Sequence, residues 1–298
     1  MPHYYFLTLL AVVLQIFRHL EQKKLVDHFD KSTITLMRFL LPLPFAVVYL
    51  IIFKHFLDWR FLLMSAVVSS LQISGGILLL KSLSKQNFAN SMALAHTELL
   101  FASILGVCFF KQKFTLLMFV AIIVILLAVF LISNFKFKSK NINKASFFAT
   151  VSGFIFACQA FLMKETSVYF IKINAGGNNF ISALTLFFAV HLFHNIFLIT
   201  HKITQKKLFT EVKKILQYES GLSFIKIGVI SSICTALWYY VYTAGEVVMI
   251  KAISQLEVVL AVIVSHFILK EKFILKEVLG IVLLLAGLFL LIYLKEIM

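Results

Sequence analysis

The sequence predicts an all-helical integral membrane protein with ten transmembrane helices, arranged as two inverted five-helix repeats. Three observations support this: the composition, the number and length of the apolar runs, and a similarity between the two halves. Hydrophobic residues occupy 61% of the 298 positions and charged residues 14%, whereas soluble domains are about 45–50% apolar and about 25% charged. The composition therefore disfavours a soluble enzyme, and it excludes a disordered chain, which requires low hydrophobicity.

Apolar runs of transmembrane length follow one another along the whole chain. A helix needs about 20 apolar residues to cross the hydrocarbon core of a bilayer. Runs of this kind, each bounded by polar residues or glycine, occupy residues 4–20, 32–53, 61–80, 88–110, 114–134, 145–163, 179–199, 222–244, 247–269 and 273–294. We expect a single transmembrane domain over residues 1–298. The first run lacks a basic n-region and a cleavage site, so it is predicted to be a mature helix and not a signal peptide.

Two connections are longer than the others. Residues 135–144 form a basic linker at the midpoint, which divides the chain into a first repeat of about 1–138 and a second of about 139–298. Residues 201–220 place Leu208, Val212, Ile215 and Leu216 on one helical face. This segment fits equally an amphipathic helix on the lipid headgroups or a solvated loop.

The net charge of +15 is carried by residues between the apolar runs. Anionic lipid headgroups are therefore the expected partner, and nucleic acid is not. The three cysteines lie inside apolar runs and form no disulfide framework. His191 and His194 lie one helical turn apart without a third ligand, so no metal site and no cofactor are predicted.

The two halves resemble each other when the chain is shifted by 159 residues (257 − 98 = 159). Residues 93–131 then lie over 252–290, and Glu98 matches Glu257. A Lys-x-Lys-Phe turn follows in both copies, at Lys111–Phe114 and Lys270–Phe273. Each half contains an odd number of predicted spans, so the halves should enter the membrane in opposite orientations, a construction used by secondary transporters.

At these residues the chain resembles the EamA-type transporters of the drug/metabolite transporter superfamily. The elements that carry the resemblance are Met37-Arg38-Phe39 in the second run, Thr97-Glu98-Leu99 in the fourth, Thr235-Ala236-Leu237-Trp238-Tyr239 in the eighth and Leu256-Glu257-Val258 in the ninth. The resemblance implies a multi-pass permease of the inner or plasma membrane. Leu99 and Val258 replace the proline that often follows the family's glutamate, which weakens any transfer of substrate preference.

The charged residues inside the predicted spans are candidate site residues, because a charge near the bilayer centre costs at least about 2.5–3.5 kcal/mol. Glu98 and Glu257 are expected to face a shared cavity, where they bind a cationic group or carry a proton; the alternative is hydrogen bonding that only stabilises helix packing. Arg38 is either an anion-binding or counter-charge group that lines the cavity, or it forms a fixed pair with an acidic neighbour such as Glu98. Lys251 is expected to extend to the membrane interface, with Glu246 as an alternative partner.

Four further residues complete the predicted substrate and ion pathway. His96 is either a proton-relay member or a packing residue, and Gln255 is assigned to the same pathway. Trp238 and Tyr239 either form a wall of the substrate cavity or belong to an interfacial aromatic belt.

The expected function is secondary transport of a small organic metabolite, such as an amino acid or an amine, by alternating access. Protons are the candidate coupling ion, and the chain is expected to act as a monomer or a homodimer. No phosphate-binding Gly-x-x-x-x-Gly-Lys-Ser/Thr motif occurs in the sequence, so ATP hydrolysis is not expected of this chain. The alternatives are an integral membrane enzyme that acts on lipid, and a channel.

Overall fold

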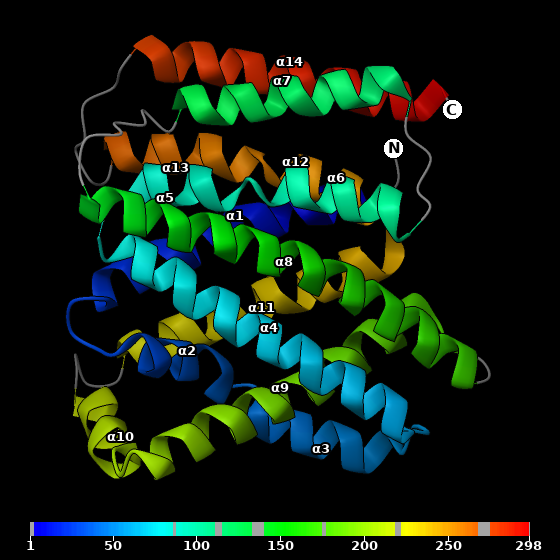
Figure 1. Ribbon diagram of the computed structural model, residues 1–298. Helices are drawn as coiled ribbons and strands as arrows, with labels where there is room; N and C mark the ends of the chain where they lie inside the picture. The colour runs from blue at the N-terminus through cyan, green and yellow to red at the C-terminus, as the bar shows by residue number, and fades with distance from the viewer. Residues whose placement is uncertain are drawn as a thin grey trace.

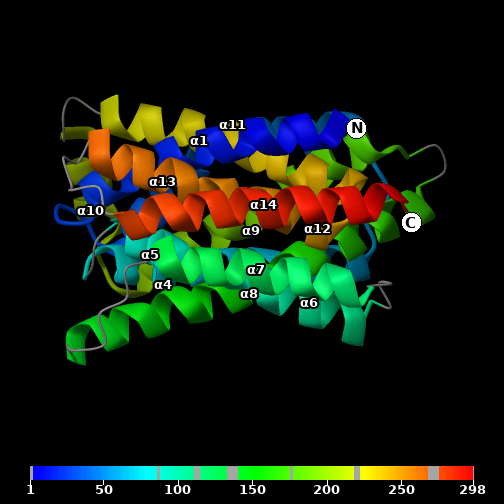
Figure 2. The ribbon, with the colours of Figure 1, turned by 90° about the horizontal axis from the view of Figure 1, so that it is seen from above.

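The computed structural model describes residues 3–85, 88–110, 115–132, 140–174, 177–217, 222–267 and 275–297, and within these ranges every regular element is an α-helix. Most of the helices run roughly along one common direction (Figure 1). The start of the first helix and the end of the last lie at the same end of the bundle in two perpendicular views (Figures 1 and 2). An even number of crossings gives this arrangement.

The helices of the two halves follow each other without an intervening domain. Those of the first half are α1 (His3–Leu25), α2 (Lys31–Leu40), α3 (Leu43–Phe53), α4 (Trp59–Leu83), α5 (Phe88–Ala95), α6 (Glu98–Cys108) and α7 (Leu116–Ile132). Those of the second half are α8 (Lys140–Ile173), α9 (Asn179–Thr204), α10 (Leu208–Gln217), α11 (Leu222–Ala244), α12 (Val247–Ser254), α13 (Leu256–Phe267) and α14 (Leu275–Ile297).

Eight segments of the described chain are long and apolar enough to cross a membrane. Six of them are the single helices α1, α4, α8, α9, α11 and α14, and the other two, Asn90–Cys108 and Val247–Val264, combine α5 with α6 and α12 with α13. The bent pair α2 and α3 makes a ninth if it counts as one span, and α7 is an apolar helix of only 17 residues. The structure thus supports eight or nine spans, and the predicted number of ten stays a prediction.

Three predicted spans are broken near their middle. α2 and α3 meet at 43°, where Pro42 and Pro44 have no amide hydrogen to continue the helical ladder. The fourth and ninth predicted runs break at His96 and Thr97 and at Gln255, without proline or glycine at the break. The sequence pattern suggested continuous helices there. The breaks place Glu98 and Glu257 in the first turn of the half-helices α6 and α13.

The last helices of the two halves, α7 and α14, pack directly against each other. A Cβ atom on Gly280 would lie 2.6 Å from Ile132 Cγ1, and one on Gly287 would lie 2.8 Å from Ile125 Cγ1. Residue numbers rise along α14 as they fall along α7, so the two helices are antiparallel, as Figure 1 shows. They are the pair that the 159-residue shift aligns (116 + 159 = 275).

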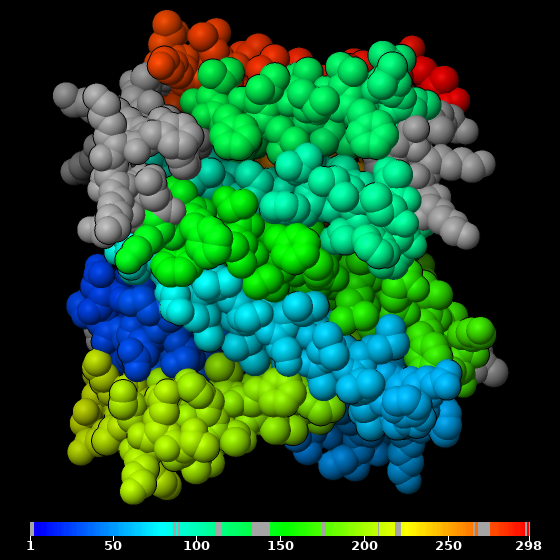
Figure 3. Space-filling model, viewed as in Figure 1, coloured from blue at the N-terminus to red at the C-terminus, as the bar shows by residue number. Residues whose placement is uncertain are grey.

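Close packing also joins α4 to α8. The Ser152 hydroxyl donates a hydrogen bond of 2.8 Å to the carbonyl of Gly75, and a Cβ on Gly75 would lie 2.8 Å from the Phe156 ring. Figure 3 shows these two long helices side by side on one face of the molecule. Large apolar side chains are exposed on α7 and α8, among them Leu117 at 56% and Phe147 at 64%, as expected of a surface that contacts lipid.

The segment after α9 is a helix, which confirms the helical interpretation over the loop. In α10, Ile215 is 4% exposed whereas Phe209 is 88% exposed. Glu211 accepts a hydrogen bond of 3.0 Å from Thr33, and the Lys214 ammonium donates to the carbonyl of His28. α10 therefore docks on the connection between α1 and α2, and its expected place on the headgroups stays a prediction.

Several features of the sequence fall outside the described residues. These are positions 135–139 of the midpoint linker and the Lys-x-Lys-Phe turns at 111–114 and 270–273.

Candidate substrate and ion pathway

A polar cavity of about 80 Å³ lies inside the bundle, between helices of both halves. Its volume is that of a few water molecules. From the first half it is lined by Gln15, Arg18, His19, Gln22, Arg38, Gln72, Gly76, Leu79 and Glu98, and from the second half by Phe156, Gln159, Ala160, Met163, Thr235, Trp238, Tyr239, Tyr242 and Lys251. The cavity is therefore made jointly by the two halves.

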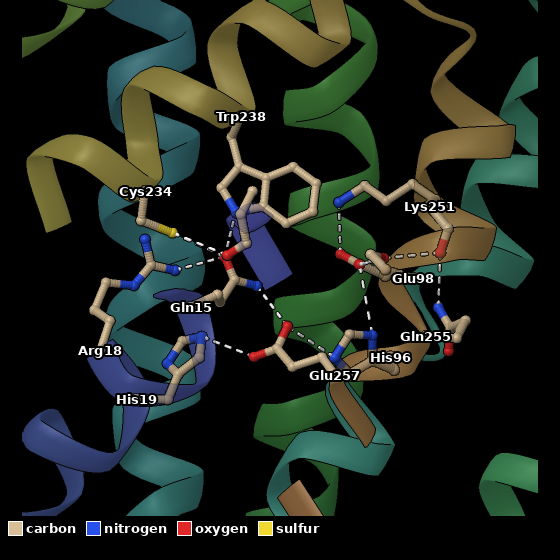
Figure 4. A network of polar contacts seen from close by, with 12 residues as sticks. Gln15, Arg18, His19, His96, Glu98, Cys234, Trp238, Lys251, Gln255 and Glu257 are labelled. Carbon is tan, nitrogen blue, oxygen red and sulfur yellow. Dashed lines mark hydrogen bonds and ion pairs between the residues drawn. The ribbon is translucent and has the colours of Figure 1, made fainter. Parts of the chain in front are cut away.

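Helix α1 directs a row of polar side chains to this cavity. Gln15, Arg18, His19 and Gln22 follow the i, i+3, i+4, i+7 spacing that places them on one helical face. The side-chain oxygen of Gln15 accepts hydrogen bonds from Trp238 Nε1 at 2.6 Å and from Arg18 Nη2 at 2.9 Å (Figure 4). Gln15 thus connects α1 to the aromatic side chains of α11.

Glu257 is fully buried and contacts three side chains from the first half. Its Oε2 accepts a hydrogen bond of 2.6 Å from Gln15 Nε2 and lies 3.2 Å from His96 Nε2. Its Oε1 lies 3.5 Å from His19 Nε2. The carboxylate therefore sits between two imidazole rings that are both buried (Figure 4).

Glu98 contacts a different set of partners. Its Oε2 lies 2.7 Å from Lys251 Nζ, and its Oε1 accepts a hydrogen bond of 3.4 Å from the Ser254 hydroxyl. His96 Nδ1 lies 3.8 Å from Glu98 Oε1, so His96 connects the two glutamates that the repeat predicted. We call Glu98, His96, Glu257 and His19 the carboxylate network. Both carboxylates begin a half-helix, where the helix dipole favours negative charge.

Lys251 does not extend to the membrane interface, so the expectation for this residue is wrong. The residue is 5% exposed, and its ammonium pairs with Glu98. Glu246, the alternative partner, instead lies 2.9 Å from Lys295. Because α12 ends at the break and packs against α6, the Lys251 side chain points inward, toward the neighbouring span.

Arg38 lines the cavity, which agrees with one of the two interpretations given for this residue. The alternative, a fixed pair with Glu98, is wrong because Lys251 occupies that carboxylate. The Arg38 guanidinium lies 4.8 Å from the centre of the Phe39 ring.

Trp238 and Tyr239 are 7% and 1% exposed and line the cavity, so the interfacial-belt interpretation is wrong. The Tyr239 hydroxyl donates a hydrogen bond of 3.1 Å to Gln72 on α4. Gln255 lies in the break between α12 and α13, where its amide donates to the carbonyl of Lys251 at 3.1 Å. Gln255 is not among the residues that line the cavity.

The sequence prediction missed several polar side chains of the site, among them Gln15, Arg18 and His19 on α1 and Lys251 on α12. The first run was predicted to end at residue 20, which placed Arg18 at a membrane edge, whereas α1 continues to Leu25. The regular spacing of polar residues within an otherwise apolar helix was the available signal for the three residues on α1.

The two histidines of α9 have packing contacts. The His194 ring stacks on Phe39, with centroids 3.8 Å apart and a 4° interplanar angle, and His191 Nδ1 lies 2.7 Å from the carbonyl oxygen of Phe187. Across the described ranges, no three side chains of His, Cys, Asp or Glu gather as a metal site would require.

Comparison with known proteins gives two findings. The EamA-like transporter family matches the sequence twice, over residues 3–134 and again over 143–293, and so divides the chain near its midpoint. A solved structure described only as "Crystal structure of protein" is similar, with a TM-score of 0.69 over 98% of this chain and 97% of that chain at 9% identity. This likeness concerns the fold alone. No curated protein matches the sequence.

Proposed function

This chain belongs to the EamA-like transporter family, a family of multi-pass membrane transporters of small solutes, and we propose that it is a secondary transporter that works by alternating access. Its substrate is a small organic metabolite, and its location is the inner or plasma membrane. The cavity that both halves line is the observation that carries the proposal, because a rocking motion between two halves opens such a cavity to either side in turn.

The proposed architecture is ten spans in two inverted five-span repeats. The antiparallel contact of α7 with α14 supports inversion, since these helices occupy equivalent places in the two halves. The ten runs comprise the eight long segments, the bent pair α2 and α3, and α7. Ten is also an even number, which agrees with the two termini at one end of the bundle.

Protons are the proposed coupling ion. The carboxylate network is a continuous series of titratable groups, in which His96 lies within 3.8 Å of both Glu98 and Glu257. A proton that moves along it changes which of these groups are charged, and so changes the contacts that hold α5, α6 and α13 together. Such a change can couple proton movement to a change of conformation.

Between the two substrate classes expected from the sequence, an amino acid has more support than an amine. An amine would need a free carboxylate, and both glutamates already contact cationic or titratable partners. An amino acid also carries a carboxylate of its own, which suits the arginines of the cavity.

The proposal is tested by uptake into liposomes that contain the purified chain, over a panel of metabolites, with and without a pH gradient. We expect saturable uptake that a pH gradient accelerates. Glu98→Gln and Glu257→Gln should each reduce uptake while the protein still inserts into the membrane. Glu246→Gln is the matched control, because this glutamate is exposed and pairs at the end of α14.

Three results would contradict parts of the proposal. Uptake that rises linearly with concentration would indicate a channel. Wild-type rates from both glutamine variants would remove the carboxylate network from the mechanism. An uptake rate that does not change with the pH gradient would exclude protons as the coupling ion.

A further inference from the structure

The cavity contains two buried arginines that form no ion pair with any carboxylate of the described residues. Arg18 on α1 and Arg38 on α2 are 6% and 4% exposed and both line the cavity. Arg18 donates a hydrogen bond to the neutral amide oxygen of Gln15. In the described ranges neither guanidinium has an acidic group within ion-pair distance, and the Nε of each lacks a hydrogen-bond partner.

The two nearby glutamates are not available to these arginines. Glu98 contacts Lys251 at 2.7 Å, and Glu257 contacts Gln15, His19 and His96. Both guanidinium groups line the same small cavity. A buried charge without a counter-charge costs several kcal/mol, so the unoccupied cavity concentrates positive charge that an anion would neutralise.

The rest of the lining suits the body of an organic molecule attached to such an anion. Trp238 and Tyr242 stack with ring centroids 5.4 Å apart on one wall. Gln72 and Gln159, from the neighbouring helices α4 and α8, add amide groups that can donate or accept hydrogen bonds. The guanidinium fork matches a carboxylate or a phosphate with two parallel hydrogen bonds.

We propose that Arg18 and Arg38 together bind the anionic group of the substrate, and that the transported class is compact organic solutes bearing a carboxylate or a phosphate ester, which includes the amino acids favoured above. This inference rests on the proposed function, because it takes the cavity to be the transport site. The volume of about 80 Å³ is below the roughly 150 Å³ of a cavity that holds benzene. A cavity of this volume is too small for a nucleotide-linked metabolite.

The experiment measures direct binding to the full chain in lipid nanodiscs, by isothermal titration and by thermal stabilisation. The probes are lactate, succinate and glycerol phosphate, with the diamine putrescine as the cationic comparison. We expect at least one anion to bind and putrescine not to bind. Arg18→Met and Arg38→Met, which keep an apolar stem, should each weaken anion binding about tenfold or more, since one charge-assisted contact is lost.

Two further variants separate binding from folding. Arg38→Lys keeps the charge without the fork and should retain part of the affinity. Arg60→Gln is the matched control, because this arginine is exposed at the start of α4, and it should bind anions as the wild type does.

Without ligand, Arg38→Met should melt no lower than the wild type, since no ion pair is lost. A lower melting temperature would assign Arg38 a structural role and overturn the proposal.

Failure of this inference can be told apart from failure of the proposed function. Binding and uptake of putrescine without any anion binding would overturn the anion site and leave transport standing. Anion binding that depends on both arginines, without uptake into liposomes, would leave the site standing and overturn transport. Nanodiscs with and without phosphatidylglycerol identify the source of the anion, because lipid phosphate at the site would compete with the soluble probes.

Discussion

The buried pair of Glu98 and Lys251 gives a quantitative prediction. Their charged atoms lie 2.7 Å apart, with side chains 9% and 6% exposed, and they join α6 of the first half to α12 of the second. Coulomb attraction at this distance amounts to about 6 kcal/mol at an effective dielectric constant of about 20. The cost of removing both charges from water is of similar size, so the intact pair contributes little net stability.

Removing one partner has a much larger effect than removing both. Glu98→Gln or Lys251→Met alone leaves a buried charge without its counter-charge, which is expected to cost about 3–5 kcal/mol of unfolding free energy. The double variant leaves no such charge, so its stability should lie near that of the wild type. The two positions should therefore show a coupling energy of several kcal/mol in a double-mutant cycle.

The assay is reversible unfolding of the purified chain in mixed detergent micelles, followed by circular dichroism. Glu246 and Lys295 form the control cycle, because this pair is half exposed at the end of the bundle and should couple by only about 0.2–1 kcal/mol. A Glu98/Lys251 double variant destabilised by the sum of its two single variants would refute the reasoning. Wild-type stability without uptake in the double variant would separate the folding role of the pair from its transport role.

Three other predictions concern separate parts of the chain. Gly280→Ala should lower the free energy of unfolding by about 1–3 kcal/mol, although alanine has the better helix propensity, because the new methyl group would lie 2.6 Å from Ile132 Cγ1. At the start of α4, the hydrogen bond from Tyr169 lowers the pKa of Asp58. The stability that the charged Asp58 gives the folded protein is therefore present above the unfolded-state pKa, and it is lost as the pH falls through the lower folded-state pKa. Tyr169→Phe should weaken this dependence in melts between about pH 2 and pH 5. Trp238→Phe keeps an aromatic ring but removes the indole hydrogen bond, and should reduce liposome uptake about fivefold.

The elements that the sequence predicts well are those that depend on local pattern. Each apolar run coincides with a helix or a broken pair of helices, and the 159-residue shift identifies Glu98 and Glu257, which His96 connects in the structure. The breaks themselves are not visible in the sequence of the fourth and ninth runs. Gly153 lets α8 approach the Ala95 carbonyl so closely that a Cβ on it would lie 2.4 Å away, a contact between distant segments that no local rule predicts.

The partners of the buried charges also depend on tertiary packing. Arg38 was predicted to have Glu98 as one possible partner, and Lys251 was assigned to the interface, because helical spacing relates residues only within one span. The observed pair joins residues 153 positions apart (251 − 98 = 153). Only the placement of α12 against α6 decides that the lysine, and not the arginine, neutralises this carboxylate.

Glu98 and Glu257 occupy equivalent places in the two repeats but have different partners, which bears on the proposed alternating access. Shifted by the repeat, Lys251 corresponds to Met92 (251 − 159 = 92), a buried apolar residue. Glu98 thus pairs with a lysine, whereas its counterpart Glu257 lies against the imidazole rings of His19 and His96. In the proposed alternating access, exchanging the roles of two halves with unlike partners gives inward-facing and outward-facing forms of unequal energy.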